Sequence, residues 1–195
     1  MSEWWRYRIS DFLMYSARTW YRLVEQYNEA LWPAHLVAIL LGIVVIWLVL
    51  RPRPEQGRAI AAITALLWSW VAIVWHLQYF LTINWAARWF AAGFGVQATL
   101  LLWFGVVRRD LTFDVGGRVV SRVGMAILLF AVLGYPLIAI GSRRGAVQSE
   151  VFGMMPDPTA LATIGLLLMT ERRRWLLAVP IAWFLLSGSI RLYLE

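Results

Sequence analysis

The sequence predicts an all-α integral membrane protein with six transmembrane helices, preceded by an amphipathic helix at the membrane surface. Hydrophobic residues make up 61% of the 195-residue chain, whereas soluble domains average about 45–50%. Six apolar stretches, separated by short connections, fill the chain between residues 33 and 194. Most of them approach the ~20 residues that cross a hydrocarbon layer of about 30 Å as a helix.

Residues 1–32 are expected to form a separate segment of one or two interfacial helices. Ser10 and Ser16 are suitable N-cap residues, the second for a helix that starts near Ala17. Apolar residues then recur at steps of three or four, which gives one apolar helix face: Trp20, Leu23, Val24, Tyr27 and Leu31. Such a helix can lie in the plane of the lipid headgroups. A helix that packs on a partner protein would have the same pattern.

Residues 33–195 form the predicted six-helix transmembrane domain. The expected helices are Pro33–Leu50, Ala59–Tyr79, Ala86–Val107, Val123–Gly141, Pro158–Thr170 and Trp175–Tyr193. The fifth rises only ~20 Å at ~1.5 Å per residue, and Pro156 prevents its extension as a regular helix. We therefore expect residues 151–158 to enter the outer leaflet as non-helical backbone, which is tolerated only against protein or a wet cavity. The connection 108–122 fits either a short hairpin or a surface helix.

Arginine is distributed unevenly over the two sets of connections. The chain has no Lys, so its net charge of +7 depends on Arg. The connections 51–58, 107–122 and 171–174 carry three, four and three arginines, whereas 80–85 and 142–157 together carry two. Because positively charged connections stay in the cytoplasm, both termini are expected on the extracytoplasmic side.

Several classes of function are not expected. The chain has no Cys, which excludes disulfides, thiolate metal sites and Cys nucleophiles. It also lacks Gly-x-Ser-x-Gly, His-Glu-x-x-His and glycine-rich phosphate-loop motifs, so enzymatic activity is not expected. No basic–aromatic motif of a nucleic-acid-binding module is present, and the arginines are expected to contact lipid phosphates instead. No acidic residue falls inside an expected span, which argues against a carrier with a buried acid.

Five residues near the outer ends of the expected helices are the candidate ligand site: His76, Asn84, Tyr135, Met155 and Asp157. They combine polar and soft donor groups at similar depth, next to a helix too short to cross alone. The first functional hypothesis is therefore an outward-facing site that binds or transports a small solute or a metal ion, with His76 as the principal ligand.

His35 and His76 are also the candidate ligands of a transition metal or a haem, because both lie near the outer boundary. The alternative is that His35 lies among the headgroups and His76 hydrogen-bonds a neighbouring helix. No cofactor is assigned from the sequence.

The second functional hypothesis is a non-catalytic accessory subunit of a larger membrane complex. The small size and the small-residue spacing of Ala87, Ala91 and Gly95 suit close packing against another helix. This hypothesis implies a membrane protein partner. Membrane lipids are expected as partners under either hypothesis, and a second copy of the chain is the alternative to a membrane protein partner.

The segment Phe152-Gly-Met-Met-Pro-Asp-Pro-Thr159 resembles the pattern of an uncharacterised family of bacterial multi-pass membrane proteins. The opening from Trp4 to Phe12, the turn 51–59 and Ile83-Asn-Trp-Ala86 resemble that family too. The likeness covers most of the chain and implies a multi-pass fold in the bacterial inner membrane. It implies no established activity.

Overall fold

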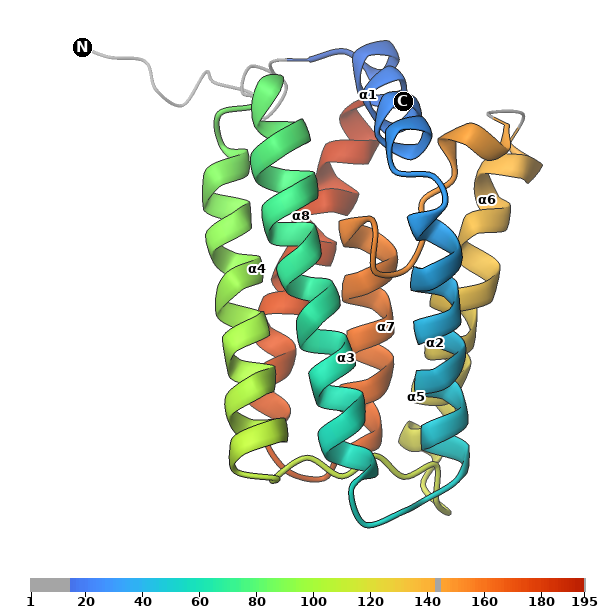
Figure 1. Cartoon of the computed structure of the whole chain (residues 1–195), viewed down its shortest axis with the longest axis vertical. Helices are drawn as coiled ribbons and strands as arrows, with labels where there is room; N and C mark the ends of the chain where they lie inside the picture. Colours follow the sequence, from blue (N-terminus) through green and yellow to red (C-terminus); the bar gives the residue numbers. More distant parts are fainter. Residues whose placement is uncertain (1–14, 143–144, 195) are drawn as a thin grey trace.

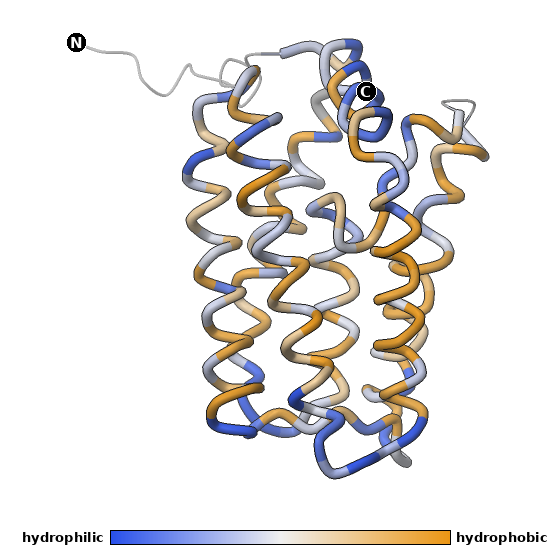
Figure 2. Tube along the Cα trace, viewed as in Figure 1, coloured by the Kyte–Doolittle hydropathy of each residue, from blue (hydrophilic) through white to orange (hydrophobic). Residues whose placement is uncertain are grey.

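The computed structural model describes residues 15–142 and 145–194, and these residues form a bundle of helices without any β-strand. The long helices run roughly parallel to one another, and α1 lies across one end of the bundle (Figure 1). We call this end the α1 end. The opposite end, formed by the connections 51–55, 108–118 and 170–173, is the arginine-rich end. Figure 2 shows apolar residues along the middle of the bundle and hydrophilic residues gathered at both ends.

The α-helices are α1 (Ala17–Ala30), α2 (Ala34–Leu50), α3 (Gln56–Trp70), α4 (Ala87–Leu101), α5 (Val119–Leu129), α6 (Tyr135–Gly141), α7 (Pro156–Met169) and α8 (Ala178–Leu194). Three π-helical segments continue the long helices without a break, namely η3 (Val71–Tyr79), η5 (Leu102–Val107) and η6 (Phe130–Gly134). Short 3₁₀ turns complete the chain: η4 (Phe80–Thr82), η7 (Ala146–Gln148) and η8 (Arg174–Leu177).

The helices confirm an all-helical membrane fold but not six spans. Four stretches are long and apolar enough to cross a membrane: Gln56–Thr82, Ala87–Val107, Val119–Gly141 and Arg174–Leu192. A fifth follows if α1 and α2, which meet at an 88° bend, form one broken span. The expected fifth helix is α7, whose 14 residues rise only ~21 Å.

Helix α1 begins where the sequence predicts, and its apolar face covers the end of the bundle. The Ser16 side chain caps the helix by accepting a hydrogen bond from the Thr19 backbone N–H at 3.2 Å. Tyr27 is fully buried, and the Trp20 ring packs edge-on against Trp75 and Phe80. This face therefore contacts the protein itself. The first of the two expected interfacial helices lies outside the described residues.

Helix α7 is the core of the bundle. Eleven of its 14 residues are buried, and it packs against α3, α5 and α8. Gly124 of α5 and Gly165 of α7 let these two helices approach closely, since a Cβ on either glycine would lie 2.5–2.6 Å from the carbonyl oxygen of the other. Because α7 is enclosed by protein, its length does not have to match the membrane.

The chain reaches the start of α7 as non-helical backbone inside the bundle. Gly153 adopts a φ of +78°, which favours glycine, and its N–H donates to Thr159 Oγ1 at 2.8 Å. The Met154 carbonyl accepts from the Tyr27 hydroxyl at 2.8 Å. Pro156 occupies the first helical position of α7, where the missing N–H has no helical partner to lose. Side chains thus satisfy backbone that water cannot reach.

The connection at residues 108–118 is irregular backbone, neither a hairpin nor a surface helix, and α5 begins at Val119. Asp110 holds it to the turn before α8, because its Oδ2 accepts from Arg173 Nη2 at 2.8 Å. This hydrogen bond lowers the pKa of Asp110 below its usual value. Arg173 also lies 4.8 Å above the Phe104 ring, so one arginine links two connections and α4's π-helical end.

Replacing Gly165 with Ala should destabilise the bundle. The new Cβ would lie 2.6 Å from the Gly124 oxygen and 2.9 Å from the Leu128 nitrogen, and these backbone atoms cannot move without separating α5 from α7. We expect a loss of about 1–3 kcal/mol, measured as a lower unfolding midpoint in detergent. Gly93→Ala is the matched control, because nothing lies within 4 Å of its Cβ position, and it should be neutral or stabilising. Equal midpoints for the two variants would contradict the close α5–α7 crossing.

Candidate functional site

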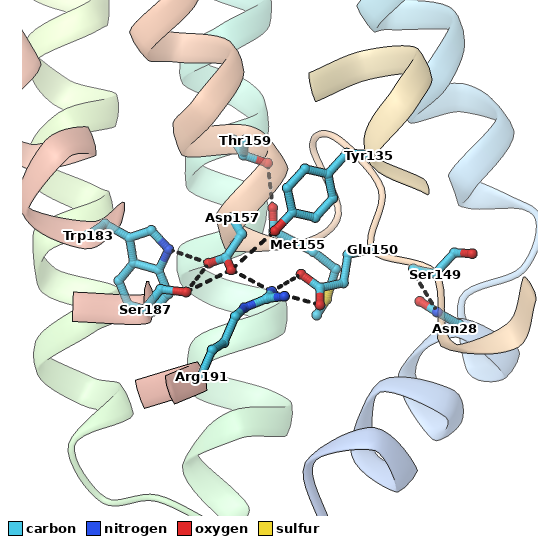
Figure 3. Close-up of polar contacts among 10 residues, drawn as sticks. All are labelled: Asn28, Tyr135, Ser149, Glu150, Met155, Asp157, Thr159, Trp183, Ser187 and Arg191. Atoms are coloured by element: carbon cyan, nitrogen blue, oxygen red, sulfur yellow. Dashed lines mark hydrogen bonds and ion pairs between the residues drawn. The ribbon is translucent and has the colours of Figure 1, made fainter. Parts of the chain in front are cut away.

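Asp157, in the first turn of α7, is the centre of a buried hydrogen-bonded cluster (Figure 3). Its Oδ1 accepts from Trp183 Nε1 at 2.8 Å, and the Ser187 hydroxyl lies 2.7 Å from both carboxylate oxygens. Its Oδ2 also accepts from Arg191 Nη2 at 2.5 Å and faces the Tyr135 hydroxyl at 3.4 Å. One carboxylate thus joins α7 to α6 and to three residues of α8.

Arg191 connects Asp157 to a second buried carboxylate, that of Glu150. Its Nη2 lies 2.8 and 2.6 Å from the two oxygens of Glu150. The Glu150 and Asp157 side chains are only 5% and 6% exposed, whereas that of Arg191 is 35% exposed. We call Tyr135, Glu150, Asp157, Trp183, Ser187 and Arg191 the Asp157 cluster.

The local sequence explains how the cluster forms. Trp183, Ser187 and Arg191 recur at intervals of four, which places them on one face of α8. Asp157 lies near the N-terminus of α7, where the helix dipole favours a negative charge. Each ionised group in the interior then requires a partner, because an unpaired buried charge is strongly unfavourable.

The cluster contains some of the sequence-predicted site residues and not others. Tyr135 and Asp157 lie together, and Met155 is buried directly before α7. The His76 ring packs edge-on against Trp183, with centroids 5.2 Å apart. His76 therefore contacts the cluster through this tryptophan ring. Asn84 is buried near the start of α4, where its Oδ1 accepts from the Ala86 N–H at 3.0 Å. Its observed role is to hold that turn.

The two histidines of the expected metal or haem site have different surroundings. His35 Nε2 lies 2.9 Å from Asn28 Oδ1, and its ring stacks on Trp32. His76 is fully buried in η3 among rings of η4, α4 and α8, including Phe94 at 4.8 Å. Within the described residues, no group of three or more acidic or histidine side chains is placed to hold a metal ion.

A scan against protein families matches residues 17–195 to a family of unknown function, DUF6064. The chain belongs to the DUF6064 family. It is also similar to a protein named UPF0060 membrane protein from Psychrobacter arcticus (strain DSM 17307 / VKM B-2377 / 273-4). The two are 38% identical over 80 residues, which cover 40% of this chain and 71% of that protein. No solved structure matches the chain. The apolar helices and this similarity together identify the DUF6064 protein as a multi-pass membrane protein.

Sequence reasoning missed four residues of the cluster in this DUF6064 protein: Glu150, Trp183, Ser187 and Arg191. The expectation that the interior holds no acidic side chain was wrong, because Glu150 and Asp157 are both buried although neither falls inside an expected span. The four-residue spacing on α8 was the available signal. It did not identify the partner on α7, which lies 26 to 34 residues away in the chain.

The lengths of the hydrogen bonds predict how two conservative substitutions differ. Trp183→Phe removes the 2.8 Å bond to a buried carboxylate, and bonds to charged groups contribute about 1.5–3 kcal/mol. Tyr135→Phe removes only a 3.4 Å contact, which is long for an O–H···O bond, and should cost below about 0.5 kcal/mol. Unfolding in detergent measures both. A larger loss for Tyr135→Phe than for Trp183→Phe would contradict the arrangement around Asp157.

Proposed function

We propose that this DUF6064 protein binds a small polar solute at the Asp157 cluster, from the α1 end, as a step in its transport, and that it does so without catalysis. The observation that carries this proposal is the position of the cluster. It lies inside an apolar bundle, where α7 begins partway along the bundle's length (Figure 1).

Two physical arguments support a binding role. Ionisable residues within membrane bundles are costly and mark functional sites by default. Many carriers also bind their solutes where a discontinuous helix begins inside the membrane, next to non-helical backbone. The buried segment 151–155 and the first turn of α7 have this form.

The free edge of Arg191 suggests the chemistry of the solute. Its hydrogen bonds to Glu150 and Asp157 all use Nη2, and neither Nε nor Nη1 has an acceptor among the described residues. The side chain is 35% exposed, and a guanidinium edge suits a planar pair of acceptor oxygens. We therefore propose a solute that presents a carbonyl or carboxylate oxygen to Arg191.

Arg191→Gln should abolish solute binding. A panel of small carboxylates, amides and polyols would be screened for compounds that raise the unfolding midpoint of the purified protein. A compound at 100 times its Kd should stabilise the wild type by ~2.7 kcal/mol and should not stabilise Arg191→Gln. Arg122→Gln, at an exposed position of α5, is the control and should respond like wild type. Equal stabilisation of Arg191→Gln, or no response from any compound, would contradict the proposal.

We also propose that the protein lies in the bacterial inner membrane with the α1 end outside. Ten arginines belong to the connections of the arginine-rich end and their flanking residues, against two in the connections at the other end. The positive-inside rule then directs the arginine-rich end to the cytoplasm.

Cysteine labelling tests this orientation without background, because the chain has no Cys. Trp85 and Arg172 are exposed at opposite ends of the bundle. A membrane-impermeant maleimide should label Trp85→Cys in intact cells and Arg172→Cys only after permeabilisation. The reverse result would show that the orientation is inverted.

A second candidate function is that of an accessory subunit. The apolar residues Ile181 and Leu185 of α8 are exposed, and a Cβ at Gly188 would meet nothing within 4 Å. Small residues on a lipid-exposed face allow close helix–helix contact. Purification in mild detergent at native abundance distinguishes the two candidates, because a stoichiometric membrane protein partner favours the second. A lone monomer or a homo-oligomer would count against the second candidate.

A further inference from the structure

A groove of about 370 Å³ opens beside the bend between α1 and α2. Its walls are largely apolar and include Trp32, Leu36, Ile39, Val147 and Val151. Sites for small ligands commonly have volumes of ≈ 300–1,000 Å³. Trp32 and Leu36 are 64% and 55% exposed, so the groove is open toward the surroundings of the bundle.

The hydrogen bonds of Asn28 show which nitrogen of His35, a residue that lines this groove, carries a proton. Its Nδ2 donates to the carbonyl oxygens of Val147 at 2.6 Å and Ser149 at 2.9 Å. An amide nitrogen has two N–H groups, so both are used. The remaining atom, Oδ1, can only accept, and it lies 2.9 Å from His35 Nε2. His35 Nε2 therefore carries a proton and donates it to Asn28.

The other nitrogen of His35 is then a buried acceptor that has no donor. An imidazolium in this largely apolar, 93% buried position would be a poorly solvated charge, so the ring is neutral. A neutral ring with hydrogen on Nε2 has a lone pair on Nδ1. His35 Nδ1 is buried and has no hydrogen-bond partner among the described residues. Buried polar atoms in native proteins are nearly always paired, and His35 lines the groove.

We propose that this groove binds a membrane amphiphile with a hydroxyl head, which donates a hydrogen bond to His35 Nδ1 while its hydrocarbon chain packs along Trp32, Leu36 and Ile39. The bend places the groove where α1, at the end of the bundle, meets α2, which runs along it (Figure 1). A lipid in the adjacent leaflet has the same orientation, with its head at the level of an interfacial helix and its chain along the membrane helices. This site is separate from the Asp157 cluster and does not depend on the proposed solute.

Two probes with matched chains isolate the hydrogen bond. Dodecanol has the hydroxyl donor, and dodecyl methyl ether has none. The protein would be purified in dodecyldimethylamine oxide, a detergent without a hydroxyl, and titrated with each probe while its thermal unfolding is followed. We expect dodecanol to bind wild type about fivefold more tightly than the ether, which is the effect of one net hydrogen bond of ~1 kcal/mol.

Two variants locate the binding. His35→Phe keeps an aromatic ring against Trp32 but removes Nδ1, so dodecanol and the ether should bind it equally. Ile39→Trp fills the groove and should remove the binding of both probes. Equal binding of the probes to wild type, absence of binding, or unchanged binding to Ile39→Trp would each overturn the proposal. The wild-type comparison alone is decisive if either variant fails to fold.

Discussion

Asp157 and Arg191 bring opposite charges together inside the bundle, with 2.5 Å between Oδ2 and Nη2. In this interior each charge would be strongly unfavourable without the other. The pair therefore constrains the relative position of α7 and the end of α8. Trp183 and Ser187 add hydrogen bonds to the same carboxylate from the same face of α8. The position of α8 along α7 is thus set by a single acidic side chain.

The two prolines beside Asp157 explain why α7 is short. If α7 continued toward the α1 end, Pro156 and Pro158 would lie in the helix interior. There, their missing backbone N–H groups would leave helical carbonyl oxygens without partners. The chain instead approaches Asp157 as an irregular segment whose polar atoms are satisfied by Tyr27, Asn28 and Thr159. Tyr27 and Asn28 belong to α1, so the amphipathic helix also supports the site. Both polar regions of the protein, the Asp157 cluster and the groove at His35, border this irregular segment.

Local patterns in the sequence predicted the elements that depend on nearby residues. The Ser16 cap, the apolar face of α1 and the shortness of the helix after Pro158 all follow from spacing within a few positions. Six spans were predicted, whereas the described residues contain four or five stretches that are long and apolar enough to cross a membrane. The difference arises because α2 and α7 have only 17 and 14 residues. Helix α7 resembles a span by its apolar residues, but 11 of its 14 residues are buried in protein.

The candidate site was predicted only in part, because its contacts join residues that are far apart in the chain. Asp157 and Tyr135 were named, but Arg191 was not singled out within the last expected helix and Glu150 lay in a connection. Trp68 donates to Thr163 on α7 at 2.7 Å and Trp183 donates to Asp157. Only the packing of α3 and α8 on α7 brings these partners together.

A double-mutant cycle on Asp157 and Arg191 tests the central claim most directly. The free energy of unfolding would be measured for wild type, Asp157→Asn, Arg191→Gln and the double variant under the same detergent conditions. Breaking a buried pair from one side should cost about 3–5 kcal/mol, and the second change should then cost much less. The account predicts a coupling energy above about 1.5 kcal/mol. Additive losses, with coupling below about 0.5 kcal/mol, would contradict the claim that this pair holds α8 to α7.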